Sequence, residues 1–257
     1  MDRRNGGGAV RERERVLEGG AVHDVVRIGS TVRRAPHERY LYVRELLDLL
    51  ERREWDGAPR HIGSDARGRE VFGYIEGRAA VTAPERAAAG ADGALVQVAR
   101  LTRALHDITH GTSAAGGHDV VCHNALAPGN TVYTVEDGDW WPIAFIDWDL
   151  AAPGDRVHDL AHVCWRYLGL GPAITDVPDA ARRIALVCDA YGLGAARASL
   201  LDEILARQER CLRGIEAAAA HAEPPAGGPG GVGAADEVRG AHAWVAAHRR
   251  QLAMFLG

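Results

Sequence analysis

The chain has 257 residues, 47% of them hydrophobic and 25% charged, which is ordinary for a globular protein with a sizeable core. Its 30 basic and 35 acidic side chains give a formal net charge of −5, so it lacks the basic footprint of a nucleic-acid-binding protein. No apolar run approaches the roughly 18 residues of a membrane helix, and the N-terminus has no apolar signal core. We therefore expect a cytoplasmic protein with neither nucleic-acid nor membrane partners.

The basic and sulfur-containing residues add two constraints. All 30 basic residues are arginine, so any phosphate site in this chain lacks the lysine that many such sites use. The four cysteines form no C-x-x-C pair and fit no zinc-site spacing, which indicates reduced, mostly buried thiols.

The first third of the chain alternates short apolar runs with turn residues. This pattern predicts two strand hairpins with a helix between them, in the order strand, strand, helix, strand, strand. The turns are Gly29-Ser30 and an Ala-Arg-Gly segment. The expected strands are 22–28, 31–34, 59–65 and 69–77, and the expected helix is 38–53.

After Gly77 the composition turns helical, with one further hairpin around the turn 136–139. We expect a Pro/Gly-rich mobile loop over 223–236. This segregation predicts an α+β fold of two lobes, a β-rich lobe over 1–77 and a helical lobe over 78–257, with a ligand between them. The expected strands are 131–135 and 141–146, and the expected helices are 94–108, 159–168, 181–192, 199–221 and 238–255.

Asn130 and Asp147, 17 residues apart, flank the hairpin around the turn 136–139. A hairpin returns its second strand beside its first, so the two side chains should lie close together. An amide oxygen and a carboxylate at one end of a hairpin suit a hard cation such as Mg²⁺. Asp149 would share the face of Asp147 if the strand continues, and Trp148 would point into the core.

Three motifs together resemble the aminoglycoside phosphotransferase and choline kinase group, which has a protein-kinase-like fold, and in particular its small actinobacterial members. The group's catalytic loop runs H-x-D-x-x-x-x-N, and its metal motif is I-D-W or I-D-F. The corresponding stretches here are HNALAPGN (123–130), FIDWD (145–149) and PGDRVHDLA (153–161).

The resemblance implies a role for each matching residue. Asp147 and Asn130 would hold the magnesium ions that bridge the phosphates of ATP or GTP. His123 would pack beneath the loop, and Asp159 would brace it from the following helix. Adenine would lie against the backbone of Gly73, Tyr74 and Ile75.

The nucleotide-binding lobe departs from the group's pattern at the phosphate-binding lysine. Arg33 or Arg34, on the second strand, is the expected substitute, with a helix partner such as Glu38 or Glu45. No G-x-G-x-x-G signature is present, and a loose phosphate cover at Gly19-Gly20 is the remaining expectation.

The largest departure is Ala125, which stands where the group has the aspartate that accepts the acceptor's hydroxyl proton. The sequence therefore predicts a phosphotransferase impaired at this base, acting on a small molecule or a peptide. Ala125 is read either as an engineered Asp→Ala substitution or as the mark of a natural pseudokinase that binds nucleotide or peptide without catalysis. Five acidic residues either attract a cationic acceptor or simply form solvated helix faces. They are Glu203, Glu209, Glu216, Asp236 and Glu237.

Overall fold

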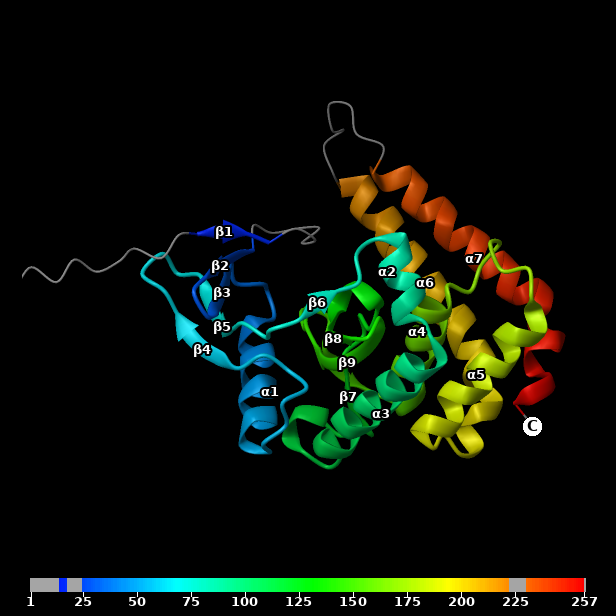
Figure 1. Ribbon diagram of the computed structural model, residues 1–257, viewed down its shortest axis with the longest axis horizontal. Helices are drawn as coiled ribbons and strands as arrows, with labels where there is room; N and C mark the ends of the chain where they lie inside the picture. The colour runs from blue at the N-terminus through cyan, green and yellow to red at the C-terminus, as the bar shows by residue number, and fades with distance from the viewer. Residues whose placement is uncertain (1–13, 18–24, 222–229, 257) are drawn as a thin grey trace, which may run out of the picture.

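The computed structural model describes residues 14–17, 25–221 and 230–256, and Figure 1 shows a small sheet-rich lobe beside a larger helical lobe. The small lobe holds a five-stranded antiparallel sheet in the order β1-β2-β3-β5-β4, with α1 packed beside it. The predicted α+β two-lobed architecture is confirmed. The elements of this lobe are β1 (Arg15–Val16), β2 (Val26–Ile28), β3 (Thr31–Arg34), α1 (Tyr40–Arg52), β4 (His61–Ser64) and β5 (Glu70–Gly73).

Both predicted hairpins of the small lobe are present. Gly29 adopts φ +58° in the tight turn between β2 and β3, where Ile28 faces Thr31. The buried face of α1 carries aliphatic side chains at helical spacing, as the sequence pattern predicts. The expected phosphate cover at Gly19-Gly20 lies outside the described residues.

The larger lobe contains the remaining helices, a three-stranded sheet in the order β6-β8-β9 and a two-stranded ladder of β7 with β10. Its predicted hairpin is the β8–β9 pair. The elements are β6 (Arg78–Ala79), α2 (Ala83–Ala89), α3 (Asp92–Thr109), β7 (Val120–Cys122), β8 (Thr131–Glu136), β9 (Asp139–Phe145), β10 (Ala152–Gly154), α4 (Arg156–Leu168), α5 (Val177–Tyr191), α6 (Leu200–His221) and α7 (Gly230–Leu252), with four short 3-10 turns.

Two helices differ from the sequence-based expectation. The helix α7 begins at Gly230, so the predicted loop is helical over 230–236, and its part over 223–229 lies outside the described residues. Packing against α6 explains this, because tertiary contacts outweigh the low helix propensity of glycine. The unpredicted α2 carries a capping box of Thr82 and Glu85, a signal that was legible in the sequence.

The main core lies in the helical lobe. The apolar stripe of α3 is buried against α4, α5 and the β8–β9 hairpin, and Trp148 is buried as predicted. Cys122, Cys164 and Cys188 are free thiols in buried positions, and Cys211 is half-buried. Within the described ranges, no helix combines the length and apolarity that crossing a membrane requires.

The chain passes from one lobe to the other through residues 74–77, where the predicted boundary falls. Gly77 has φ +153°, and a Cβ added there would meet Cγ1 of Val132 at 2.5 Å and the carbonyl oxygen of Tyr133 at 2.7 Å. Only glycine lets the connection lie this close to β8. The backbone of the crossing is therefore fixed against β8, the strand that begins directly after Asn130.

We expect Gly77→Ala to lower the free energy of unfolding by about 1–3 kcal/mol, because the added methyl overlaps backbone and side-chain atoms. Gly214→Ala is the matched control, since a Cβ at that position in α6 meets nothing within 4 Å. The control should be neutral or stabilising by up to about 1 kcal/mol. Urea unfolding measures both, and equal effects of the two changes would contradict the close approach.

Candidate active site

The loop that follows β7 is held by a carboxylate behind it. Asp159, on α4, has no exposed surface. Its oxygens accept hydrogen bonds from the backbone N–H of His123 at 2.7 Å and of Asn124 at 2.8 Å, and one lies 3.2 Å from Nε2 of His106 on α3. The predicted bracing of the loop by Asp159 is confirmed.

These donors keep the buried carboxylate ionised. Burial alone raises the pKa of Asp159, but the hydrogen bond and electrostatic attraction of His106 and the backbone N–H of Asn124 lower that pKa to about 2. The loop therefore rests on a permanent negative charge near neutral pH.

His123 lies fully buried beneath the loop, with its ring 4.5 Å from that of Trp148. Its Nε2 is 3.1 Å from the carbonyl oxygen of Ile146, and its Nδ1 accepts the N–H of Ala125 at 3.3 Å. Burial lowers the pKa of His123 to about 4 despite the nearby charge of Asp159. The ring is therefore neutral at pH 7 and ties the loop to the metal motif, in agreement with its predicted structural role.

Asn130 and Asp147 lie together at one end of the β8–β9 hairpin, as predicted. The N–H of Ile146 donates to the carbonyl oxygen of Asn130 at 2.9 Å, immediately before Asp147. The side-chain amide nitrogen of Asn130 donates to the carbonyl oxygen of Ala125 at 2.9 Å, so its amide oxygen is the atom left to act as a ligand. Asp147 adopts φ +64°, a conformation that is costly for a residue with a side chain and is often found at functional sites.

Arg34 connects the two lobes at this point. Its Nη1 donates to Oδ2 of Asp149 at 2.7 Å, its Nη2 bonds the second oxygen, and Nη1 lies 3.8 Å from Oδ1 of Asp147. Asp149 therefore lies beside Asp147 although β9 ends before both. Neither expected helix partner, Glu38 nor Glu45, is within 4.0 Å of the Arg34 guanidinium, which pairs with the helical lobe instead, so the prediction of a helix partner was wrong.

Arg33 points to the other face of the sheet, because neighbouring residues of a strand alternate. Its Nε lies 3.6 Å from Oδ2 of Asp65, in the β4–β5 turn. Of the two arginines that the sequence left open, the structure brings only Arg34 to the candidate site.

The proposed adenine edge is partly occupied by protein hydrogen bonds. The N–H of Gly73 donates to the carbonyl oxygen of Arg60 at 2.9 Å, and the N–H of Tyr74 donates to the carbonyl oxygen of Ser30 at 2.8 Å. The guanidinium of Arg27 covers the Tyr74 ring at 3.5 Å from its centre. Of the three predicted residues, Ile75 is therefore the one whose N–H makes no hydrogen bond to another described backbone group.

Sequence reasoning missed Arg207 of α6, which reaches the loop from the helical lobe. Its Nε donates to Nδ1 of His162 at 3.0 Å, its Nη1 donates to Oδ1 of Asn124 at 3.2 Å, and its Nη2 bonds the carbonyl oxygen of Asn124. Nothing in the sequence distinguishes it from the neighbouring arginines of an amphipathic helix. Only the packing of α6 on α4 brings it there.

His106, Cys122 and Asp159 form the one trio of potential metal ligands in the described part of the chain. The Cys122 thiol donates to the carbonyl oxygen of Asp155 at 3.3 Å, and burial raises its pKa, so the thiolate that a metal requires is disfavoured. The trio is better described as part of the loop support than as a metal centre.

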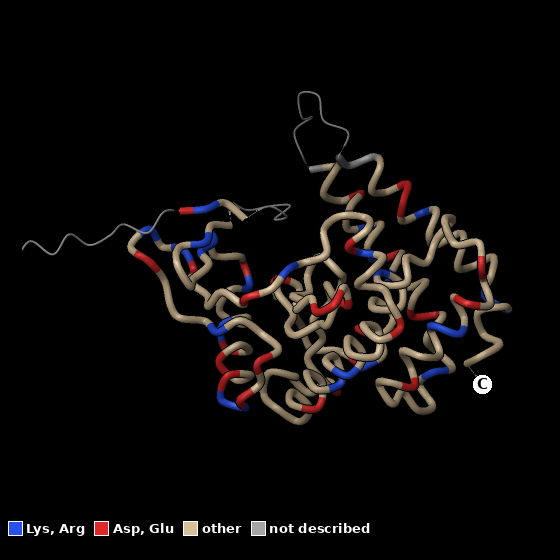
Figure 2. Tube along the Cα trace, viewed as in Figure 1, with Lys and Arg blue, Asp and Glu red and all other residues tan. Residues whose placement is uncertain are grey.

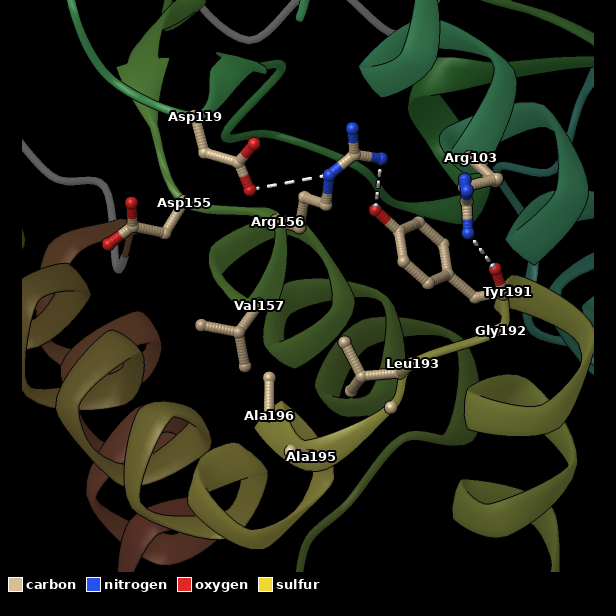
Figure 3. Close-up of a pocket in the computed structure, with 11 residues that line it drawn as sticks. Arg103, Asp119, Asp155, Arg156, Val157, Tyr191, Gly192, Leu193, Ala195 and Ala196 are labelled. Carbon is tan, nitrogen blue, oxygen red and sulfur yellow. Dashed lines mark hydrogen bonds and ion pairs between the residues drawn. The ribbon is translucent and has the colours of Figure 1, made fainter.

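A cavity of about 350 Å³ lies at the start of α4, and its lining includes none of the predicted site residues. Figure 3 shows Arg156 between Asp119 and the Tyr191 hydroxyl on one wall. That hydroxyl is 2.7 Å from Nδ1 of His106, so the cavity wall is connected to the loop support. The polar lining residues are Arg103, Asp119, Asp155, Arg156 and Tyr191.

Comparison with known proteins places this geometry in a family. The sequence model of the phosphotransferase enzyme family matches residues 28–197, two thirds of the chain and all of the site described above except Arg207. The chain belongs to this family. It is also 28% identical over 217 residues to the trifolitoxin immunity protein of Rhizobium leguminosarum bv. trifolii, covering 74% of this chain and 78% of that protein.

Solved structures of family relatives share the fold at low identity. An ethanolamine kinase of Plasmodium vivax superposes with a TM-score of 0.69 at 10% identity, covering 94% of this chain and 83% of that one. A choline/ethanolamine kinase family protein of Mesorhizobium loti gives 0.59 at 17% identity, covering 95% and 92%. An aminoglycoside phosphotransferase of Streptomyces rimosus, in complex with ADP and streptomycin, gives 0.54 at 15% identity, covering 76% and 91%. The bilobal protein-kinase-like fold is confirmed.

The buried loop support predicts an acid-sensitive fold. His123 has a pKa of about 4 in the folded protein, below the ordinary 6.5, so the unfolded chain binds more protons as pH falls. Stability should therefore decline from pH 6.5 downward, by about 2–3 kcal/mol at pH 4.5 from this residue alone. His162, whose pKa burial also lowers, adds to the decline.

Urea unfolding between pH 7.5 and 4.5 measures this decline. His123→Gln should reduce the slope of the unfolding free energy against pH by the equivalent of up to about one proton. His118→Gln, at an exposed position, is the matched control and should keep the full slope. A slope that His123→Gln leaves intact would refute the assignment of the buried ring as neutral.

Proposed function

We propose that this family member transfers the γ-phosphoryl group of ATP or GTP to a hydroxyl group of a small molecule or a peptide, and that Ala125 slows the transfer. The observation that carries the proposal is the meeting of Asn130, Asp147 and Asp149 at one end of a hairpin, opposite Arg34 of the other lobe. Oxygen ligands on one lobe and a guanidinium on the other are what a magnesium-bound triphosphate between them requires.

The residues present fit magnesium. Asp147 offers a carboxylate that is half exposed. The side-chain nitrogen of Asn130 donates to Ala125, so its side-chain oxygen can act as a neutral ligand. Asp149 supplies a second carboxylate beside them. When bound, magnesium would bridge the nucleotide phosphates and offset the charge that develops on them during transfer.

Arg34 is the proposed phosphate ligand in place of the family lysine. A guanidinium binds phosphate oxygens through two parallel hydrogen bonds, as it binds Asp149 in this structure. Binding phosphate would therefore require Arg34 to give up or share Asp149. That exchange would free the carboxylate for the metal at the same moment.

The protein's remaining contribution is to position the acceptor. The loop from His123 to Asn130 keeps the hydrogen bonds that fix its backbone, and Ala125 N–H and C=O are both engaged. The missing carboxylate would have accepted the acceptor's hydroxyl proton, and water would have to take that proton here. We therefore propose slow transfer rather than none.

The alternative is a pseudokinase that binds nucleotide, or a peptide, and catalyses nothing. Ala125 favours it, because two carboxylates near the loop are already engaged: Asp149 is held by Arg34, and Asp159 is buried beneath the loop. Nucleotide binding is common to the enzyme and to a nucleotide-binding pseudokinase, and turnover distinguishes these two proposals.

Calorimetry with ATP or GTP tests the shared step. We expect magnesium-dependent nucleotide binding. Asp147→Ala should lower the affinity by about tenfold to hundredfold, because a charged ligand of the metal is removed. Arg34→Ala should weaken binding about tenfold, since one charge-assisted contact to phosphate is lost. Arg33→Ala, on the opposite face of the sheet, is the matched control. Absence of magnesium-dependent binding of either nucleotide would refute both proposals.

Restoring the base tests the impairment. Ala125→Asp should raise turnover by about 10²–10⁴, the usual contribution of a positioned general base. Release of ADP or GDP with candidate acceptors is the measurement. Asn124→Asp is the control, because it adds the same carboxylate to the loop one residue away. If Ala125→Asp is no faster than the present chain with the acceptor bound, the pseudokinase proposal replaces the enzyme.

A further inference from the structure

Arg207 is a partly buried cation whose hydrogen-bond partners are all neutral. It donates to His162, to the side-chain oxygen of Asn124 and to the carbonyl oxygen of Asn124. Burial and the charge of Arg207 lower the pKa of His162 well below its ordinary value. The His162 ring is therefore neutral near pH 7. Among the described residues, no Asp or Glu oxygen lies within 4.0 Å of the Arg207 guanidinium.

Such a charge normally has a counter-ion, because burying an unpaired ion is costly. Asp159 is the carboxylate whose charge acts most on Arg207, and it only partly offsets the cost of burial, which lowers the pKa of the guanidinium. The oxygens of Asp159 already accept three other hydrogen bonds. Three of the five N–H donors of Arg207 are used, and two remain for an anion.

The surrounding acids do not create a cation site. Figure 2 shows acidic and basic positions interleaved over the helical lobe rather than separated by sign. Each of the five acids that the sequence offered for a cationic acceptor pairs with an arginine of this lobe, which supports their description as solvated helix faces. The pairs are Glu203 with Arg210, Glu209 with Arg213, Glu216 and Asp236 with Arg239, and Glu237 with Arg166.

We infer that the acceptor is a small hydroxy compound carrying a carboxylate or a phosphate, and that Arg207 binds this anionic group beside Ala125. The inference rests on the proposed function and specifies its substrate class. Arg207 holds the peptide group between Asn124 and Ala125, so an anion on its remaining donors would lie next to the position where the base is missing. A cationic hydroxy compound at the same place would meet an uncompensated positive charge.

Four probes that share one carbon skeleton separate charge from shape: glycerate, glycerol 3-phosphate, glycerol and 3-amino-1,2-propanediol. Ligand-observed NMR titrations at constant ionic strength, with and without magnesium and a non-hydrolysable ATP analogue, measure their binding to the full chain. We expect both anions to bind and the neutral and cationic compounds to bind at least tenfold more weakly. The ratio of glycerate to glycerol 3-phosphate affinity shows which anionic group the site prefers.

The variants identify the residue. Arg207→Gln should weaken binding of the anions by about tenfold to hundredfold, and Arg207→Lys should restore part of it, because the charge returns without the planar geometry. Arg210→Gln, one turn along the helix and paired with Glu203, is the matched control and should change binding less than twofold. Thermal unfolding of Arg207→Lys shows whether the loop support survives.

Two results would overturn the inference. One is tighter binding of the amine than of either anion. The absence of anion binding at roughly 100 mM would count equally, because a ligand of this size normally binds more tightly than that. The other is a loss of ATP affinity but not of ADP affinity in Arg207→Gln, which would make the γ-phosphate the counter-ion. Failure of the wild-type chain to bind nucleotide would instead refute the proposed function, since anion binding is also measured without nucleotide.

Discussion

Asp159 places a full negative charge where no solvent reaches, and the candidate site is arranged around it. A carboxylate in this position is stable only because N–H groups of His123, Asn124 and His106 point at it. Those hydrogen bonds fix the start of the loop. The loop in turn fixes Asn130 through the carbonyl oxygen of Ala125, and the His123 ring reaches the strand end before Asp147. The proposed metal ligands therefore depend on a charge that is fully buried behind the loop.

The ion pair of Arg34 with Asp149 is the second constraint, because it joins a side chain of the small lobe to one of the helical lobe. Both side chains are mostly buried, so the pair is more than a surface contact. Gly77 holds the chain crossing close against β8. The lobes also share hydrogen bonds, from the N–H of Phe145 to the carbonyl oxygen of Gly57 and from the Tyr42 hydroxyl to the carbonyl oxygen of Ala114. The Arg34–Asp149 ion pair is the contact between the lobes that the proposed phosphate binding would exchange.

The fold was largely predictable because its signals are local. Hairpin turns, helical apolar stripes and the boundary near Gly77 are all read from neighbouring residues. The meeting of Asn130 and Asp147 followed from hairpin geometry. The partner of Arg34 and the position of Arg207 did not, since both depend on how separate elements pack. The start of α7 at glycine residues was also not predicted, because tertiary packing outweighs the low helix propensity of glycine there.

The hydrogen bonds around position 125 involve only its backbone. The N–H of Ala125 donates to the His123 ring, and its C=O accepts from Asn130. The Ala125 side chain therefore takes no part in the hydrogen bonds that hold the loop and Asn130. Under the proposed function, exchange of aspartate for alanine here would remove the base and leave these hydrogen bonds in place. Nucleotide occupancy and chemical turnover would then be separable traits, so selection could discard one while preserving the other.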